Sequence, residues 1–405
     1  MSKLSTAKLS VVLALLALAC AAFGAGTARA ECGEEGSEEL AFQGSGKILV
    51  ALCGPSRQAA VLRLDGAGQL DPTFAEDGSL GPWPSAFSPH VAVTQDDKLL
   101  VQMRLAQGRR VVLRRFSADG RLDRSFAGGN APVPSNRNRS LPHQIRVFSQ
   151  PQGTSVVAYV GEDDGCFGGF CAERTTFLRL FRYSATGRRI AEVTRYSESW
   201  SLSNITMAPD GDILAAGEEG EYWTLTYLRT KPNLKARTAR KVPEAFDSGN
   251  SKIFPGPGKS VLLSGQEGAI GRYRPDWSLD ESFGEAGFAR CGPKDAYLEP
   301  LASLPSGGFL AQGSSAPCGL MRYQADGRPD PTFGTGGSVD LGALGLIPSR
   351  YRLESLAIGP TGQIAIAFGN EDKPIVRVSL FSPDGQLETG FGSNGVVTIR
   401  NFQAG

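Results

Sequence analysis

A five-residue motif, Leu-Asp/Glu-x-Ser/Thr-Phe, recurs along this 405-residue chain at intervals of about fifty residues. Its copies are Leu70–Phe74, Leu122–Phe126, Leu279–Phe283, Pro329–Phe333 and Leu387–Phe391. Pro replaces Leu in the fourth copy, and Gly390 replaces Ser/Thr in the fifth. The phenylalanines are 52, 157, 50 and 58 residues apart, and 157 is close to three times 52. The spacing therefore predicts seven units, two of which have lost the motif.

A polar or glycine-containing turn near the start of each unit supports this count independently. It recurs at residues 45–47, 96–98, 152–154, 210–212, 257–259, 306–308 and 361–363. In the last unit the apolar runs Leu356–Ile358 and Ile364–Phe368 flank the turn, and the run Ile375–Phe381 follows. Short strands and turns with this period are typical of propeller blades, which bury their faces only by stacking. We expect an all-β, seven-bladed β-propeller over residues 31–405. A single β-sandwich would not repeat a turn at fixed intervals.

The sequence pattern of the units, DG-x-LD-x-SFG-x-x-G, resembles that of the delta-60 repeat family of bacterial exported proteins. The resemblance covers residues 39–400 and is clear in five units. It implies a propeller-like repeat domain and no particular activity. The third and fourth units depart from the pattern, which leaves their outer strands undefined. The segment Gly395–Arg400 is expected either to be the outer strand of the last blade or to complete the first.

The N-terminus has the pattern of a secretory signal peptide over residues 1–30. Lys3 and Lys8 precede the apolar run Val11–Phe23, and Ala28-Arg29-Ala30 provides a cleavage site. The alternative is a lipoprotein anchored at Cys20, although Ala17 stands where a lipobox prefers a larger aliphatic residue. Either route predicts a secreted or otherwise extracytoplasmic protein.

The charge of the mature chain argues against polyanionic partners. Removing residues 1–30 leaves 39 Lys and Arg against 41 Asp and Glu. This balance gives no electrostatic basis for binding nucleic acid or an anionic membrane surface. No later apolar run is long enough to span a membrane. We expect a monomeric exported domain without a transmembrane segment.

The cysteines are expected to lie on one face of the propeller. If the strands of each blade run outward as a, b, c and d, the b–c loops and the blade-to-blade connections share one face, here the loop face. The a–b and c–d turns share the opposite face, here the turn face. All six cysteines that remain after Cys20 is removed or lipidated fall on the loop face. An oxidising compartment predicts three local disulfides: Cys32–Cys53, Cys166–Cys171 and Cys291–Cys318.

Acidic residues gather on the same face in the third and fourth units. They occupy the b–c loops of these neighbouring blades: Glu162, Asp163, Asp164, Glu218, Glu219 and Glu221. Several carboxylates on a loop held by a disulfide could bind Ca²⁺. The alternative is a solvated charge run on two hairpin tips. A zinc site is disfavoured because C-x2-C spacing and neighbouring histidines are both missing.

The sequence offers little for catalysis, and no catalytic residue or cofactor site is predicted. The chain has two histidines, His90 and His143, which are not in register, and it lacks G-x-S-x-G and H-E-x-x-H motifs. The apolar triplets of the inner strands show no polar residue that repeats at the axis. The leading interpretation is a non-catalytic binding module that recognises an unidentified protein or carbohydrate through the loop face. The alternatives are a metal-dependent hydrolase or lyase with its site on that face, and a structural spacer.

Overall fold

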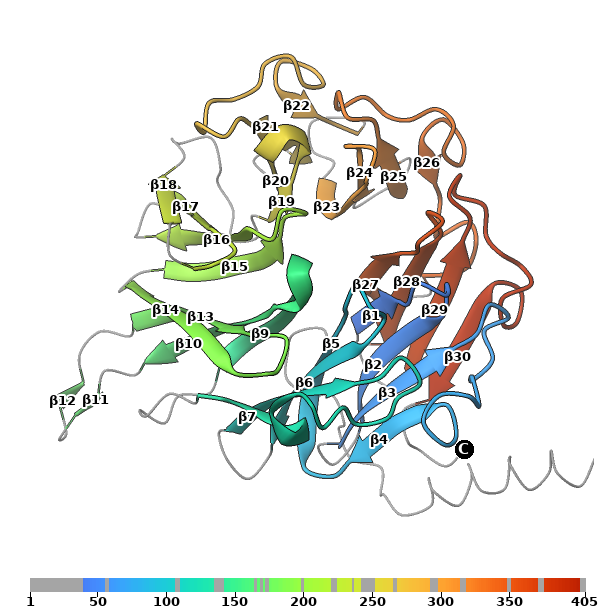
Figure 1. The fold of residues 1–405 in the computed structure, drawn as a ribbon. Coiled ribbons are helices and arrows are strands. Elements are labelled where there is room, and N and C mark those ends of the chain that lie inside the picture. Colours follow the sequence, from blue (N-terminus) through green and yellow to red (C-terminus); the bar gives the residue numbers. More distant parts are fainter. Residues whose placement is uncertain are drawn as a thin grey trace, which may run out of the picture.

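The computed structural model describes most of the chain between residues 39 and 400 (Figure 1). The described ranges are 39–54, 58–105, 110–134, 142–163, 166–167, 170–171, 175–197, 200–219, 224–234, 237–241, 252–264, 268–291, 298–313, 318–347, 351–370 and 375–400. The predicted signal peptide, residues 1–30, lies outside them. Within the described ranges, no helix is both long and apolar enough to cross a membrane.

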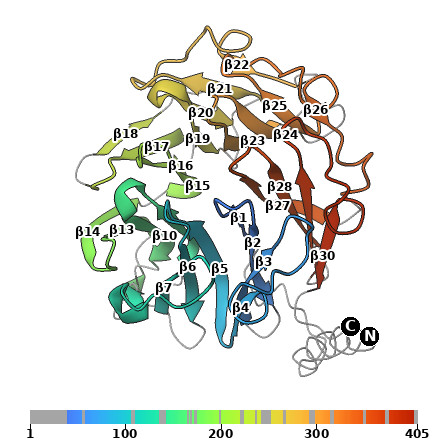
Figure 2. The same cartoon turned by 45° about the vertical axis from the view of Figure 1, so that its right-hand side comes forward.

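Seven four-stranded antiparallel sheets are arranged radially around a central axis, as Figures 1 and 2 show. This confirms the predicted all-β, seven-bladed β-propeller. Blades one and two are β1 (Glu39–Phe42), β2 (Ile48–Gly54), β3 (Gln58–Leu64), β4 (Ser79–Trp83), β5 (Ala86–Val93), β6 (Leu99–Leu105), β7 (Arg110–Phe116) and β8 (Ala131–Val133). Blade three is β9 (Pro142–Ser149), β10 (Ser155–Asp163), β13 (Thr175–Tyr183) and β14 (Arg189–Ser197), with the hairpin β11 (Cys166–Phe167) and β12 (Phe170–Cys171) in its b–c loop.

The remaining blades follow the same order. Blades four and five are β15 (Trp200–Met207), β16 (Ile213–Glu219), β17 (Thr224–Thr230), β18 (Arg237–Lys241), β19 (Ile253–Pro255), β20 (Val261–Ser264), β21 (Ile270–Tyr273) and β22 (Phe288–Ala289). Blades six and seven are β23 (Leu298–Ser303), β24 (Phe309–Gly313), β25 (Leu320–Tyr323), β26 (Ser338–Val339), β27 (Tyr351–Ile358), β28 (Ile364–Asn370), β29 (Ile375–Phe381) and β30 (Val396–Arg400). Units three and four therefore have complete sheets, although they lack the closing motif.

Each blade is one continuous stretch of chain, and non-covalent contacts close the ring. Strand β30 pairs with β29, so Val396–Arg400 is the outer strand of blade seven and does not complete blade one. At the joint between blades seven and one, the Leu40 amide donates to Ser355 Oγ at 3.0 Å, and the Gly392 amide donates to the Ala67 carbonyl at 2.8 Å.

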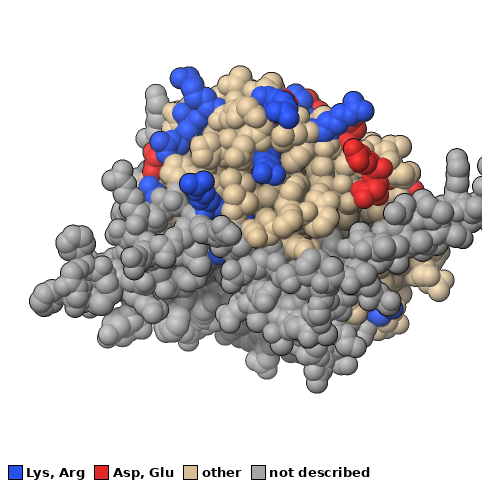
Figure 3. Space-filling model, turned by 90° about the horizontal axis from the view of Figure 1, so that it is seen from below, with Lys and Arg blue, Asp and Glu red and all other residues tan. Residues whose placement is uncertain are grey.

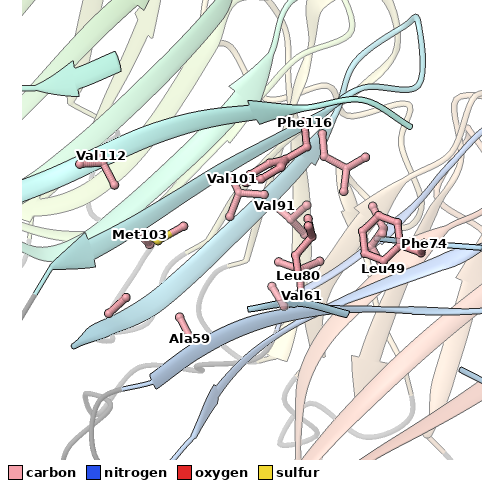
Figure 4. Packing of buried hydrophobic residues seen from close by; sticks show 13 residues of the cluster. Leu49, Ala59, Val61, Phe74, Leu80, Val91, Val101, Met103, Val112 and Phe116 are labelled. Atoms are coloured by element: carbon pink, nitrogen blue, oxygen red, sulfur yellow. The ribbon is translucent and has the colours of Figure 1, made fainter. Parts of the chain in front are cut away.

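The hydrophobic core is divided among the joints between neighbouring blades. Figure 4 shows the joint between blades one and two, where Leu49 and Val61 of blade one pack near Val91 and Val101 of blade two. Phe74, from the closing motif of blade one, is fully buried in the same cluster. The motif phenylalanine therefore fills the space between adjacent sheets.

An arginine completes the closing motif in four of the five motif-bearing blades and ties each of these four blades to the next; blade seven has Leu380 at the equivalent position. In blade one, Asp71 Oδ1 accepts from the Thr73 amide and hydroxyl, and Asp71 Oδ2 accepts from Arg63 Nε at 2.9 Å. The Arg63 guanidinium lies 4.5 Å from the centre of the Phe74 ring, and its Nη1 donates to the Ala118 carbonyl of blade two at 2.6 Å. Three further copies exist: Arg115–Asp123, Arg272–Asp280 and Arg322–Asp330.

A glycine in the c–d turn of each following blade lies against this phenylalanine. Gly120 has a φ of 88°, and a Cβ there would lie 2.9 Å from the Ala75 amide nitrogen and 3.1 Å from the Phe74 ring. The Ala75 amide also donates to the Asp119 carbonyl at 2.7 Å. Glycine is thus required both by the positive φ and by the approach of the preceding blade. The equivalent glycines are Gly68, Gly187, Gly327 and Gly385.

Candidate functional site

The loop face carries a confirmed disulfide between Cys291 and Cys318, with an S–S distance of 2.07 Å. It joins the segment after β22 of blade five to the b–c loop of blade six. Cys53 is also disulfide-bonded, and Cys32, its predicted partner, lies outside the described residues. Cys166 and Cys171 are paired across the β11–β12 ladder, but their side chains are not described, so this disulfide stays a prediction.

The predicted acidic cluster lies at the ends of two neighbouring b strands. Glu162 and Asp163 end β10, and Glu218 and Glu219 end β16. The side chains of these four residues, and the whole of Asp164 and Glu221, fall outside the described part of the molecule. No group of three metal-ligating side chains occurs among the described residues. The calcium site therefore stays a prediction.

The inner strands carry a ring of polar residues at one level of the axis. Its members stand four positions before the residue that opens each a–b turn: Glu39, His90, Arg146, Asn204, Lys252 and Ser355. In blade six this position is Pro300, and Glu299 precedes it. The expectation that no polar residue repeats at the axis is therefore wrong. The ring lies just before the apolar triplets, and aligning the units on their a–b turns would have revealed it.

Three of these polar side chains accept hydrogen bonds from backbone amides at the exposed edge of the neighbouring inner strand. Glu39 Oε2 accepts from the Val91 amide at 2.8 Å, and Asn204 Oδ1 accepts from the Ile253 amide at 2.9 Å. Ser355 accepts from Leu40 in the same way at the joint that closes the ring. The innermost strand has no further strand to pair with, so each of these side chains replaces a ladder hydrogen bond and joins two blades.

His90 is the centre of a charged cluster within this ring. Its Nδ1 lies 3.1 Å from Glu39 Oε2, and Arg146 Nη1 lies 3.3 Å from both of its ring nitrogens. Burial and the neighbouring Arg146 charge lower the pKa of His90 against the opposing effect of Glu39. Burial alone would raise the pKa of Glu39, but His90 and Arg146 hold it below its usual value. Near neutral pH, the cluster therefore contains a neutral imidazole, a carboxylate and a guanidinium.

A cavity of about 430 Å³ opens on the axis at the turn face. The last inner-strand residues of five blades line it: Phe42, Val93, Ser149, Met207 and Ile358. Prolines and uncharged polar residues form the rest of the wall, together with Asp97, whose Oδ1 accepts from the Gly44 amide at 2.6 Å. We call this cavity the axial pocket. Each blade contributes only one or a few residues to it, so no local motif could have predicted it.

A second cavity of about 410 Å³ lies at the turn face between blades six and seven and shares Ile358 with the axial pocket. In blade one, the Gln43 side chain donates to the Asp97 and Ala118 carbonyls of the next blade, at 3.2 and 3.0 Å. Blade six has Leu304 at that position, and Leu304 lines the cavity. The joint between blades six and seven therefore stays open at the turn face, whereas the Gln43 side chain closes the equivalent joint between blades one and two.

Charged side chains do not form a single-sign patch in the view of Figure 3. Basic and acidic groups both occur among its described residues, and several acidic groups lie beside basic ones. This distribution agrees with the near-neutral composition.

No protein-family model matches the chain, and no curated protein does. Solved structures that resemble it include YCF48 bound to D1 peptide, with 12% identity, a TM-score of 0.47, and coverage of 82% of this chain and 88% of that one. A Lactobacillus plantarum protein has 13% identity and a TM-score of 0.46, with coverage of 85% and 93%. A Bacteroides caccae protein of unknown function has 11% identity and a TM-score of 0.36, with coverage of 70% and 91%.

Proposed function

We propose that the chain is an exported, non-catalytic binding module of the delta-60 repeat type that takes up an uncharged, apolar group of a partner in its axial pocket. The supporting observation is the pocket itself, where Phe42, Val93, Met207 and Ile358 gather from four blades. Binding pockets are typically apolar cavities with a few polar groups at fixed positions. The single carboxylate of this lining, Asp97, is bonded to a backbone amide. Acid–base chemistry needs a positioned proton donor and acceptor, so this lining favours binding.

Carbon-13-labelled methionine methyl groups test the pocket directly. Met207 lines it, whereas Met103 and Met321 are buried in the core at 0% and 4% exposure. Titration with indole, a neutral aromatic probe, should shift the Met207 methyl resonance in a saturable way and leave the other two unchanged. Ile358→Lys should abolish the shift. Leu344→Lys, at a leucine 44% exposed outside the pocket lining, should preserve it. An unresponsive Met207, or equal shifts of all three methyl groups, would contradict the proposal.

The natural partner can be sought with the same pair of variants. Wild-type protein and Leu344→Lys should both retain the partner from the extracytoplasmic fraction, and Ile358→Lys should not.

Intact mass of the exported protein tests the localisation. A chain that begins at Glu31 supports signal-peptide cleavage, whereas a lipidated chain that begins at Cys20 supports anchoring.

A further inference from the structure

A glutamine side chain closes the turn face between blades one and two. Gln43 opens the a–b turn of blade one, and its Nε2 donates to two carbonyls of blade two, those of Asp97 at 3.2 Å and Ala118 at 3.0 Å. Its Oε1 accepts from Nη1 of Arg63, the strand-c arginine of its own blade, at 3.1 Å. One primary carboxamide is thus held by two carbonyl acceptors and one guanidinium donor.

The joint between blades three and four contains the same bridge. Gln150 opens the a–b turn of blade three, and its Nε2 donates to the carbonyls of Gly211 at 2.9 Å and Pro232 at 3.2 Å. These two residues occupy the turn positions of blade four that correspond to the two acceptors in blade two. The Gln150 Oε1 accepts from Nε of Arg182, again the strand-c arginine, at 3.1 Å. Two joints therefore hold a carboxamide with the same set of groups.

The joint between blades six and seven keeps these groups but lacks the carboxamide. Leu304 replaces the glutamine, and the two acceptor positions and the arginine position are those of Gly362, Pro383 and Arg322. All four residues line the cavity of about 410 Å³, which we call the Leu304 cavity. Among the described residues, the Gly362 carbonyl accepts no hydrogen bond, and Arg322 Nη1 donates only to the Pro383 carbonyl. Since Nη1 carries two hydrogens and a carbonyl oxygen two lone pairs, all three groups can bond a further partner.

The carboxylate at this joint is also less covered than its counterpart in blade one. There, Lys47 Nζ lies 2.6 Å from Asp71 Oδ2, and the Asp71 side chain is 5% exposed. In blade six Gly308 replaces the lysine, and Asp330, which lines the Leu304 cavity, has a side chain 19% exposed. A carboxylate and two carbonyls accept hydrogen bonds and repel an anion. The cavity therefore favours a neutral ligand with N–H donors over a carboxylate.

We propose that the Leu304 cavity binds the primary carboxamide of a ligand, in the arrangement that the Gln43 side chain adopts between blades one and two. The amide nitrogen donates to the Gly362 and Pro383 carbonyls, and the amide oxygen accepts from Arg322 Nη1. The rest of the ligand lies against apolar lining that includes Leu304, and the volume of the cavity is within the range of small-molecule sites. The cavity borders the axial pocket but does not need that pocket to be occupied.

Two sources can supply a carboxamide: a small organic amide and the glutamine side chain of a protein partner. Ligand-observed NMR titration of the exported chain tests the first with benzamide and the second with N-acetyl-glutamine methylamide. Benzoate and N-acetyl-glutamate methylamide are the matched carboxylates. Wild-type protein should bind at least one amide saturably, about tenfold or more tightly than its carboxylate, because the carboxylate lacks the donors that the carbonyls require. The amide that binds more tightly identifies the source.

Variants of Leu304 locate the binding. Leu304→Gln should abolish it, because the protein's own carboxamide then occupies the site, as in blades one and three. Leu304→Met, a change that conserves volume, is the control and should bind like wild type. Leu304→Phe, which fills the cavity with an apolar ring, should also weaken binding and keeps the test decisive if Leu304→Gln does not fold.

Three results would overturn the proposal: no saturable binding of either amide by wild type, equal binding of an amide and its carboxylate, or equal binding by wild type and a folded Leu304→Gln or Leu304→Phe variant. Binding in the axial pocket alone would shift the Met207 methyl resonance and persist in Leu304→Gln. Failure of the Leu304 cavity is therefore distinguishable from failure of the axial pocket.

Discussion

At the scale of single residues, one side chain often serves two blades. Phe333 is fully buried, and Gly385 of the following blade lies against it. A Cβ on Gly385 would approach a ring carbon of Phe333 to 2.8 Å and Val339 to 2.9 Å. The Asp384-Gly385 turn therefore reverses the chain locally and also packs against Phe333 of the preceding blade.

Gly385→Ala should destabilise the fold more than a glycine replacement that lacks this contact. Gly46 is the matched control, since its φ of 81° is close to the 84° of Gly385 and a Cβ there meets nothing within 4 Å. Gly46→Ala should cost about 1 kcal/mol, from the positive φ alone. Gly385→Ala should cost about 1–3 kcal/mol more, because overpacking is added. Urea unfolding measures both, and equal losses would refute the close-packing explanation.

His90 should make stability fall between pH 6.5 and 5. Its pKa is lowered in the folded protein, so below its ordinary value of 6.5 the unfolded chain binds a proton that the folded chain does not. This contribution to stability is complete above pH 6.5 and is lost as the pH falls, by at most about 1.4 kcal/mol per pH unit. Glu39 titrates lower, because its folded pKa lies below the ordinary 4.5.

Unfolding free energies of wild type and His90→Gln, measured from pH 7.5 to 5, check this expectation. His143 is present in both proteins, so its contribution cancels to first approximation. The variant should show a shallower decline of stability with falling pH. Parallel curves would mean that His90 is not buried in its neutral form.

The sequence revealed residues whose interaction partners are close in the chain. It did not reveal residues whose partners lie in another blade. Phe333 and the Asp-Thr pair could be predicted because apolar spacing and turn chemistry are local signals. Arg322 was missed because one of its acceptors, the Pro383 carbonyl, is 61 residues away in the next blade. The axial ring was hidden by bulges in the inner strands. Ladder registers shift just before Asn204 and Ser355, which breaks the two-residue alternation.

At the scale of elements, the strand-c arginine survives where the closing motif is lost. In blade three, Arg182 Nε donates to Gln150 Oε1 at 3.1 Å, and in blade four Arg229 Nη1 donates to the Lys259 carbonyl of blade five at 2.8 Å. The outer strands β14 and β18 still form without the motif. A blade can therefore form its outer strand without the complete closing motif.

The Cys291–Cys318 disulfide should stabilise the joint between blades five and six. It closes a loop with a sequence separation of 27 residues, for which chain entropy predicts about 3.5 kcal/mol. The double variant Cys291→Ala, Cys318→Ala should lose about 3 kcal/mol of unfolding free energy in urea. Treating it with a reductant should report any further loss from other disulfides, including that of Cys53. A loss below about 1 kcal/mol would show that the loop is already restricted in the unfolded chain.

At the scale of the whole molecule, the ring is closed by the same kinds of contact that join its other blades. The amide that follows the motif phenylalanine donates to the next c–d turn in blade one, through Ala75, and also across the closing joint, through Gly392. The apolar cluster at this joint contains Leu40 and Val50 of blade one together with Val376 and Phe391 of blade seven. No strand is exchanged between the two blades.

Moving the chain ends to another blade boundary should therefore leave the propeller intact. We predict that a circular permutant that begins near residue 142 and joins Arg400 to Glu39 through a flexible linker folds with a melting temperature within a few degrees of an unpermuted chain of residues 39–400. The linker must cross a four-stranded blade, roughly 15 Å at about 4.8 Å per strand spacing, so eight Gly/Ser residues suffice. The same permutant with Arg400 joined directly to Glu39 is the control and should be strongly destabilised. If both permutants fail to fold, closure depends on the native order of synthesis and not only on the contacts at the joint.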